Sequence, residues 1–142
     1  MRRTLILSLL ATLPVLADKK PITPPEFAAA KAPFSQAILI DGTLYVSGMI
    51  GRDPKTAEVP ADFEQEVKLC LDNIGIVLKA AGMKFSDAVS VQVYLTDMDL
   101  FAKMNGVYTT YFPEPRPART TVGVSRLAAP KAHVEITVTA RK

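Results

Sequence analysis

The apolar pattern of residues 62–82 constrains the fold of this chain more than any other feature. Its hydrophobic side chains recur every three or four residues, which places them on one face of an α-helix. Asp62 stands where an N-terminal cap is expected and Gly82 where a C-terminal cap is expected. The pattern therefore predicts an amphipathic helix that must bury one face against another layer. That face consists of Phe63, Val67, Cys70, Leu71, Ile74, Val77, Leu78 and Ala81.

Strand patterns alternate with helical ones along the rest of the chain. Asp41-Gly42 stands between two β-rich runs, and because both residues tolerate positive φ, the pair predicts a type I′ hairpin. Residues 89–95 alternate between apolar and polar side chains, which predicts a strand that buries Val89, Val91, Val93 and Leu95. The predicted elements are strands at 38–40, 43–46, 89–95, 120–125 and 134–140, and a second amphipathic helix at 100–112.

The order of these elements, ββαβαββ, predicts an α+β two-layer sandwich in which both helices cover one face of a mixed β-sheet. A chain of 142 residues with 49% hydrophobic and 22% charged content is sufficient for a single domain. The other sheet face is then polar but weakly charged. It can stay hydrated or pack against copies of the same chain, so clefts between subunits are candidate sites. The polar side chains on this face are Ser90, Gln92, Tyr94, Glu135, Thr137 and Thr139.

Residues 1–17 have the pattern of a secretory signal peptide. A basic start precedes an apolar run, and Val15-Leu16-Ala17 offers small residues at both recognition positions before Asp18. The run of about thirteen residues is short for a membrane span, which needs roughly 20, although an uncleaved anchor is the alternative. We therefore expect an exported protein, periplasmic or secreted, with an extended leader at 18–31 and the folded domain at 32–142.

The charge balance argues against nucleic-acid binding. Cleavage removes Arg2 and Arg3, which leaves 15 of the 17 basic residues against 14 acidic ones. No stripe of Lys and Arg remains to follow a phosphate backbone. We expect a small-molecule ligand, with neither a nucleic-acid partner nor a membrane contact after cleavage.

Cys70 and His133 are the only cysteine and the only histidine. Cys70 belongs to the apolar helix face, so it is expected in the core, with a reactive thiol as the alternative. One cysteine and one histidine do not form a metal-ligand set, so no metal site is expected. The sequence also lacks a Ser/His/Asp or Cys/His catalytic set and a nucleotide-binding glycine pattern.

The strongest candidate for ligand binding is Arg119, which follows the stiff, proline-rich stretch 113–117. A guanidinium holds a carboxylate through two parallel hydrogen bonds and never loses its charge, so its natural role is binding. The alternative is an exposed rim arginine. Glu135 could orient a water and carry its proton, or be a solvated residue paired with a cation. Ser47-Gly48 and Asn105 could offer polar groups to the same ligand or be ordinary turn and surface positions.

Together these residues resemble the RidA/YjgF family of reactive-imine deaminases, also called L-PSP endoribonucleases or translation inhibitors. The resemblance covers about residues 30–140, and it is specific as an ordered set of motifs. The matching stretches are Ala32-Pro33-Phe34-Ser35-Gln36-Ala37, Tyr45-Val46-Ser47-Gly48, Asp62 to Gly82 with Leu71-Asp72-Asn73, Asn105-Gly106-Val107-Tyr108, Pro117-Ala118-Arg119 and Glu135-Ile136.

The resemblance implies a homotrimer with three clefts at the subunit boundaries. It implies hydrolysis of enamine or imine forms of 2-amino acids to 2-keto acids and ammonia, without a cofactor or metal. In this reading Arg119 binds the substrate carboxylate and Glu135 holds the water, both as catalytic residues. The other implied substrate-binding positions are Thr121, Ser47, Gly48, Phe34 and Asn105.

Three residues depart from the usual family motif. Phe34 stands in place of tyrosine, Met49 in place of glutamine and Thr121 in place of cysteine. The missing hydroxyl at Phe34 implies slower turnover or a different substrate.

Two other functions remain beside imine hydrolysis. The cleft could bind a small carboxylate or a partner protein without turnover. Ribonuclease activity is disfavoured because the mature charge is nearly neutral and the chain has neither paired histidines nor an evident aromatic platform for stacked bases.

Overall fold

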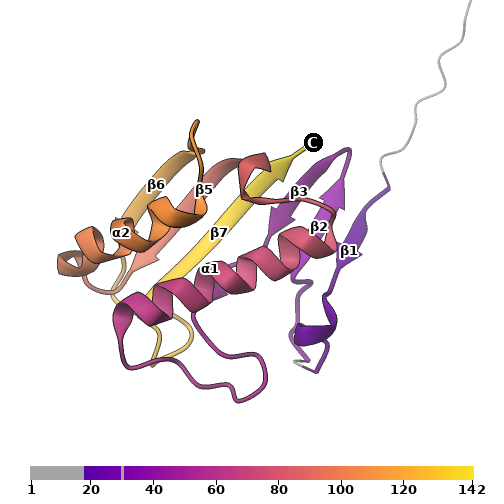
Figure 1. Cartoon of the computed structure of the whole chain (residues 1–142). Helices are drawn as coiled ribbons and strands as arrows, with labels where there is room; N and C mark the ends of the chain where they lie inside the picture. Colours follow the sequence, from indigo (N-terminus) through magenta and orange to yellow (C-terminus); the bar gives the residue numbers. More distant parts are fainter. Residues whose placement is uncertain (1–17, 30) are drawn as a thin grey trace, which may run out of the picture.

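A computed structural model describes residues 18–29 and 31–142, and the predicted signal peptide at 1–17 lies outside them. Helix α1 spans Phe63–Ala80, close to the predicted bounds. The Asp62 carboxylate accepts a hydrogen bond from the backbone N–H of Gln65 at 2.9 Å, and Gly82 follows the helix with φ of 71°. Both predicted caps are therefore confirmed. Figure 1 shows α1 and helix α2 (Phe101–Tyr111) on the same face of the sheet.

The sheet is mixed, as the element order predicts. Its strand order is β1-β2-β3-β7-β5-β6, and β4 pairs with β7 beside this path. Strands β5 and β6 are parallel, so α2 forms the crossover between them, while the other pairs are antiparallel. The strands are β1 (Lys20–Ile22), β2 (Ala37–Ile40), β3 (Thr43–Val46), β4 (Met49–Ile50), β5 (Ala88–Leu95), β6 (Ala118–Gly123) and β7 (Val134–Arg141).

The hairpin of β2 and β3 turns as predicted, since Asp41 and Gly42 both have positive φ, 47° and 71°. Two short strands were not expected. Strand β1 arises from the segment 18–31, interpreted from sequence as a leader, and pairs with β2 at the edge of the sheet. Strand β4 has two residues. Strands this short contain no alternation that a sequence pattern could reveal.

The inward face of β5 differs from the prediction at one end. Val91, Val93 and Leu95 are buried, but Val89 is 49% exposed. The pairing of β5 with β7 shifts register between Ala88 and Ser90, and this β-bulge turns Val89 outward. Burial of Val89 was therefore a wrong prediction, because the extra residue breaks the alternation.

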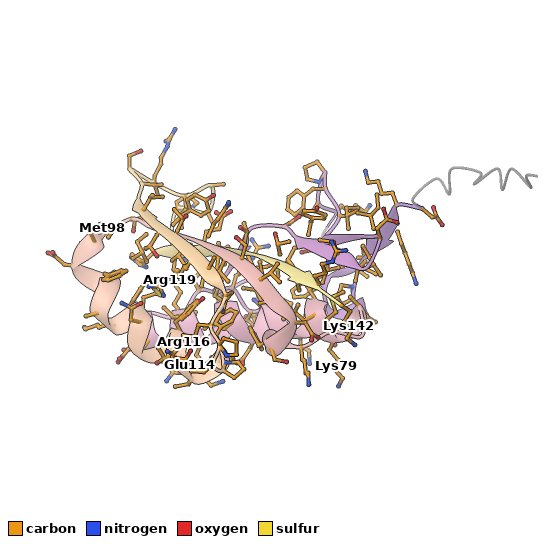
Figure 2. All side chains as sticks on the ribbon, turned by 90° about the horizontal axis from the view of Figure 1, so that it is seen from above. Lys79, Met98, Glu114, Arg116, Arg119 and Lys142 are labelled. Carbon is orange, nitrogen blue, oxygen red and sulfur yellow. The ribbon has the colours of Figure 1, made fainter. Side chains whose placement is uncertain are left out.

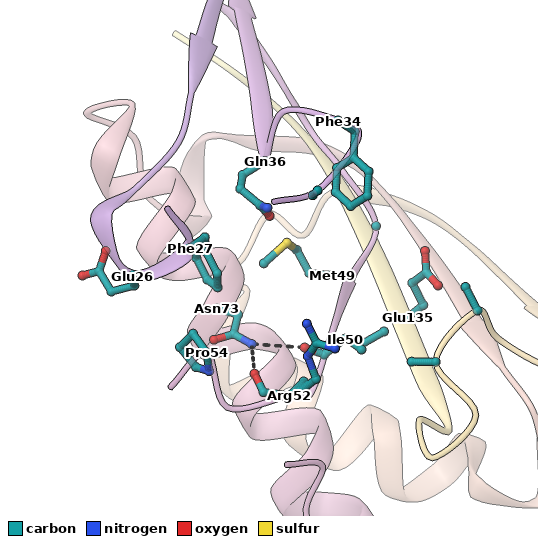
Figure 3. Close-up of a pocket in the computed structure, with 14 residues that line it drawn as sticks. Glu26, Phe27, Phe34, Gln36, Met49, Ile50, Arg52, Pro54, Asn73 and Glu135 are labelled. Carbon is teal, nitrogen blue, oxygen red and sulfur yellow. Dashed lines mark hydrogen bonds between the residues drawn. The ribbon is translucent and has the colours of Figure 1, made fainter. Parts of the chain in front are cut away.

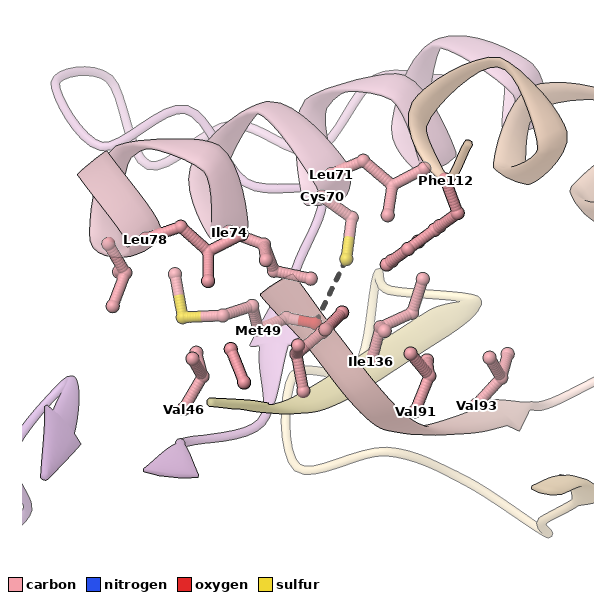
Figure 4. Packing of buried hydrophobic residues seen from close by; sticks show 14 of the residues in the cluster. Val46, Met49, Cys70, Leu71, Ile74, Leu78, Val91, Val93, Phe112 and Ile136 are labelled. Carbon is pink, nitrogen blue, oxygen red and sulfur yellow. Dashed lines mark hydrogen bonds between the residues drawn. The ribbon is translucent and has the colours of Figure 1, made fainter. Parts of the chain in front are cut away.

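The core lies between the two helices and the sheet (Figure 4). Cys70 is fully buried there and its thiol donates a hydrogen bond to the Met49 carbonyl at 3.1 Å, so its predicted core position is confirmed. Phe112 links α2 to this core, since its ring centroid lies 4.3 Å from that of Tyr108 and 5.0 Å from that of Phe85. Within residues 18–29 and 31–142, no helix combines the length and apolar character of a membrane span.

The second face of the sheet is not covered by either helix. Gln92 on this face accepts hydrogen bonds from the Tyr94 hydroxyl at 3.0 Å and from the Thr137 hydroxyl at 3.4 Å. Two large apolar side chains, Tyr45 and Val122, are 53% and 41% exposed. The open face is therefore polar with scattered apolar groups, as the sequence predicts.

Candidate active site

Arg119 lies on the edge strand β6 and points toward the helix layer. It pairs with Val91 of β5, and residues paired across a ladder share a face, so Arg119 stands on the side that carries the core. Its Cζ atom lies 4.6 Å from the ring centroid of Tyr108 and 5.7 Å from that of Phe101, both on α2. Figure 2 shows this side chain beside the helix. The two rings hold the guanidinium through cation–π contacts.

The charge of Arg119 is not neutralised by a carboxylate within the described part of the chain, where the ion pairs involve Lys68, Arg116 and His133 instead. Arg119 is also exposed to solvent. A guanidinium fixed against two rings and open on its outer side can accept a ligand carboxylate through a bidentate contact.

Two buried hydroxyls beside Arg119 have no hydrogen-bond partner among residues 18–29 and 31–142. They are the Tyr108 hydroxyl and the Thr121 hydroxyl. Thr121 follows Arg119 by two positions on β6 and therefore faces the same side. An unpaired buried hydroxyl costs about 1–3 kcal/mol, so a ligand oxygen at this place would be favourable. Burial raises the pKa of Tyr108, against the lowering effect of Arg119 and Arg116, so its hydroxyl keeps its proton at neutral pH.

Asn105 belongs to the same group of residues. It follows Phe101 by four positions and precedes Tyr108 by three, which places the three side chains on one face of α2. We call Arg119, Thr121, Tyr108, Phe101 and Asn105 the arginine half-site.

Glu135 lies on β7 and faces the opposite side of the sheet. It pairs with Tyr94 of β5 and Ile50 of β4. Burial raises the pKa of Glu135. Gly48 makes room for its carboxylate, because a Cβ atom on Gly48 would lie only 1.9 Å from Oε1 of Glu135. The backbone at Gly48 therefore lies in close contact with the Glu135 side chain.

Ser47 holds the loop that precedes β2. Its hydroxyl donates to the Ser35 carbonyl at 2.7 Å, and its backbone N–H donates to the Gln36 carbonyl at 2.9 Å. The hydroxyl hydrogen is therefore engaged within the chain. Ser47 positions Phe34, which is 56% exposed.

Glu135, Gly48 and Phe34 line one cavity of about 290 Å³ (Figure 3). Apolar walls come from Phe27 and Met49. We call this cavity with its lining residues the glutamate half-site. Its complete lining is Glu26, Phe27, Ala32, Phe34, Gln36, Gly48, Met49, Ile50, Arg52, Pro54, Asn73, Ala128, Ala129 and Glu135.

The two half-sites do not meet within one protomer. Arg119 and Glu135 lie on opposite faces of the sheet, and strand β5 separates β6 from β7. Two interstrand spacings amount to about 10 Å before the offset along the strands is added. One small molecule can contact both side chains only if they come from two copies of the chain.

Several residues of the half-sites were not found from sequence. Phe101 and Tyr108 are seven residues apart, about two helical turns, so a predicted helix would place both rings on one face. Because the candidate Arg119 follows this helix in the sequence, that spacing could have indicated a contact with the arginine. Arg52 and Gln36 enter the cavity from loops, and no sequence pattern marks a loop residue as cavity-lining.

Near the cavity, α1 contributes a buried acid that has a structural role. The carboxylate of Glu66 is fully buried and accepts hydrogen bonds from the backbone N–H groups of His133 and Val134 at 2.6 and 3.1 Å. It also contacts Nδ1 of His133 at 2.8 Å. Glu66 therefore fixes the start of β7, which carries Glu135. Among the described residues, no three His, Cys, Asp or Glu side chains come together as a metal-binding group.

Comparison with known proteins agrees with this fold. The family model described as Endoribonuclease L-PSP matches residues 25–142. A RutC family protein of Pyrococcus horikoshii is 49% identical over 67% of this chain and 76% of its own length. A Bos taurus protein named 2-iminobutanoate/2-iminopropanoate deaminase is 42% identical over 77% of this chain and 80% of its own.

Solved structures show the same fold. A Thermotoga maritima protein described as a putative endoribonuclease superimposes with a TM-score of 0.83 at 36% identity, over 88% of this chain and 98% of its own. Escherichia coli TdcF, solved with bound serine, has a TM-score of 0.81 at 32% identity, over 87% of this chain and 99% of its own. The chain therefore belongs to the L-PSP endoribonuclease family, the family of RidA and YjgF.

Proposed function

We propose that this protein hydrolyses imine and enamine forms of 2-amino acids to 2-keto acids and ammonia, in clefts between the protomers of a homotrimer. The observation that carries the proposal is the arginine half-site. Its guanidinium, which has no carboxylate partner in the described part of the chain, lies beside two hydroxyls that the same residues leave without a hydrogen-bond partner. Relatives named 2-iminobutanoate/2-iminopropanoate deaminase support the reaction. TdcF with bound serine supports a ligand that carries a carboxylate.

In the proposed reaction Arg119 holds the substrate carboxylate and thereby fixes the imine carbon. A water adds to this carbon, and the π pair of the C=N bond moves to nitrogen, which takes up a proton. The hydroxyl proton of the carbinolamine that forms is then transferred to the nitrogen as the C–N bond breaks, so a keto acid and ammonia leave. Free imines hydrolyse without a catalyst, so positioning of the two reactants supplies much of the acceleration.

Glu135 is the proposed carrier of the proton. As a carboxylate it accepts a proton from the attacking water, and as an acid it returns the proton to the leaving nitrogen. Its raised pKa suits both steps, because the proton-bound form becomes accessible closer to neutral pH. Gly48 leaves space for the carboxylate at the place where the water must stand.

The trimer is proposed because a complete site requires the arginine half-site of one protomer and the glutamate half-site of another. The open sheet face offers Tyr45 and Val122 as exposed apolar contacts beside polar groups such as Gln92. Packing of this face against other copies would cover these residues, and a closed ring would give each protomer one neighbour on either side. Each cleft would then combine Arg119 of one copy with Glu135 of the next.

The reaction can be tested with 2-iminopropionate made in place by an amino-acid oxidase acting on alanine. Semicarbazide traps the imine, so enzymatic hydrolysis lowers the initial rate of semicarbazone formation. We expect wild-type protein to lower this rate and Arg119→Gln to reduce kcat/KM at least about 100-fold, because a bidentate charged contact is lost. Lys103→Gln, which removes an exposed charge from α2, is the matched control and should keep full activity.

Two outcomes would contradict this proposal. An Arg119→Gln protein as active as wild type would remove Arg119 from the site. Tight binding of 2-oxobutanoate by a wild-type protein that does not accelerate imine hydrolysis would instead support a carboxylate-binding protein without turnover.

We also propose that the protein is exported after cleavage behind Ala17. The support is the basic start, the short apolar run and the small residues before Asp18. Cell fractionation with N-terminal sequencing tests this, and a cytosolic protein that keeps Met1 would contradict it.

A further inference from the structure

A second arginine besides Arg119 belongs to the candidate site. Arg52 lines the cavity of the glutamate half-site, at the start of the loop after β4. Its backbone is fixed on both sides. The Arg52 N–H donates to the Ile50 carbonyl at 2.9 Å, and the Arg52 carbonyl accepts a hydrogen bond from the buried Asn73 amide at 2.9 Å. In Figure 3 the side chains of Arg52, Gln36 and Glu135 surround the same cavity. Arg52 is therefore a positioned cation at the cavity wall.

Arg52 and Gln36 provide hydrogen-bond donors at this wall. In the part of the chain that the structure describes, the ion pairs do not include Arg52. Gln36 is 8% exposed, and it lines the cavity together with Arg52. The exposed guanidinium of Arg52 and the side-chain amide of Gln36 can both donate hydrogen bonds, so the cavity is suited to a ligand that offers an acceptor to both side chains.

The remaining walls suit a short aliphatic chain. Phe27, Phe34 and Met49 give apolar contact, and a volume of about 290 Å³ lies at the small end of ligand sites. Arg52 and Glu135 line the same cavity, so the positive charge of Arg52 opposes the repulsion between Glu135 and a negative ligand group. A carboxylate at the far end of a four- or five-carbon acid would meet Arg52 and Gln36 while its methylene groups contact the apolar walls.

We propose that this cavity is a side-chain subsite that selects dicarboxylic substrates, with Arg52 and Gln36 holding the distal carboxylate. The inference rests on the proposed function, in which Arg119 of a neighbouring copy holds the first carboxylate. The preferred substrates are then imines with an acidic side chain, and the products are 2-keto dicarboxylic acids and ammonia.

The test compares two keto acids of equal carbon number, 2-oxoglutarate and 2-oxopentanoate, which differ in the distal carboxylate. Titration calorimetry on wild-type protein should give a Kd for 2-oxoglutarate at least about tenfold lower, as a charged hydrogen-bonded contact provides. Arg52→Gln should reduce this ratio to below about twofold. Lys55→Gln removes an equal charge from the same loop outside the cavity and should keep the ratio.

Other outcomes separate this subsite from the proposed reaction. Arg119→Gln should weaken both ligands alike and leave their ratio unchanged. Equal affinity of wild type for the two acids, no binding of either, a ratio that survives Arg52→Gln, or an equal loss in Lys55→Gln would overturn the subsite. If no imine is hydrolysed but the ratio depends on Arg52, the subsite stands as a dicarboxylate-binding site and the proposed reaction fails.

Discussion

The substitution Gly48→Ala should displace the Glu135 carboxylate while it changes the stability of the fold only slightly. The added Cβ atom would lie 1.9 Å from Oε1 and 2.8 Å from Cδ of Glu135, whereas ordinary contacts begin at 3.4 Å. The carboxylate must therefore move by more than about 1 Å, and a misplacement of that size can cost roughly 100-fold in rate. Glu135 can move by rotation about its χ angles, and a χ angle about 30° away from a rotamer costs about 0.5–1.5 kcal/mol.

We therefore expect Gly48→Ala to lose about 100-fold in kcat/KM and about 1 kcal/mol in free energy of unfolding. The semicarbazide competition assay gives the first quantity, and urea denaturation gives the second. Gly106→Ala is the matched control, because its Cβ has no heavy atom within 4 Å and the change on α2 should stabilise the helix by about 0.5–1 kcal/mol.

Gly51→Ala provides the contrast. Its Cβ would lie 2.0 Å from the backbone oxygen of Glu66 in α1, which cannot move by a rotamer change. Overpacking of this kind costs about 1–3 kcal/mol or more. Full activity in Gly48→Ala, or a loss of stability as large as that of Gly51→Ala, would refute the inference that Gly48 leaves space for a carboxylate used in the proposed reaction.

Four further predictions concern three residues. Because burial raises the pKa of Glu135 above the usual value of a glutamate, kcat should fall as pH drops through that raised value, and Glu135→Gln should lack this acid limb. Glu135 binds its proton more tightly in the folded chain, so the free energy of unfolding should decrease as pH rises through the same range, and urea denaturation of Glu135→Gln should not show this decrease. Phe34→Tyr should raise kcat by restoring a hydroxyl and leave urea stability within about 0.5 kcal/mol, since the side chain is 56% exposed; an unchanged kcat would contradict a role for that hydroxyl. Glu66→Ala should cost roughly 3 kcal/mol in urea denaturation because it leaves the buried N–H groups of His133 and Val134 unpaired, and a loss under 1 kcal/mol would argue against this role.

Most of the fold could be predicted because its long elements have periodic sequences. Helix α1 shows its caps at Asp62 and Gly82, and β7 alternates along its length. The prediction failed where periodicity is interrupted or absent. A bulge at Val89 reverses one inward position, and β4 is too short to show a period.

The sequence indicated individual residues of the candidate site but not how they are arranged in space. The proline-rich approach marked Arg119, and the resemblance marked Glu135, but the sequence did not reveal that they stand on opposite faces of one sheet. That fact depends on strand order and register, which come from tertiary pairing. The rings of Tyr108 and Phe101 that hold Arg119 depend in the same way on how α2 packs.

Complementation between two inactive variants tests the shared site most directly. Arg119→Gln and Glu135→Gln proteins are unfolded, mixed in equal amounts and refolded together, and kcat/KM is compared with that of each variant refolded alone. If each site takes Arg119 from one protomer and Glu135 from its neighbour, about one quarter of the sites in random oligomers contain both wild-type residues. We predict recovery of about one quarter of wild-type activity. Activity no higher than that of the two variants alone, in a mixture that forms oligomers containing both, would contradict a site shared between protomers.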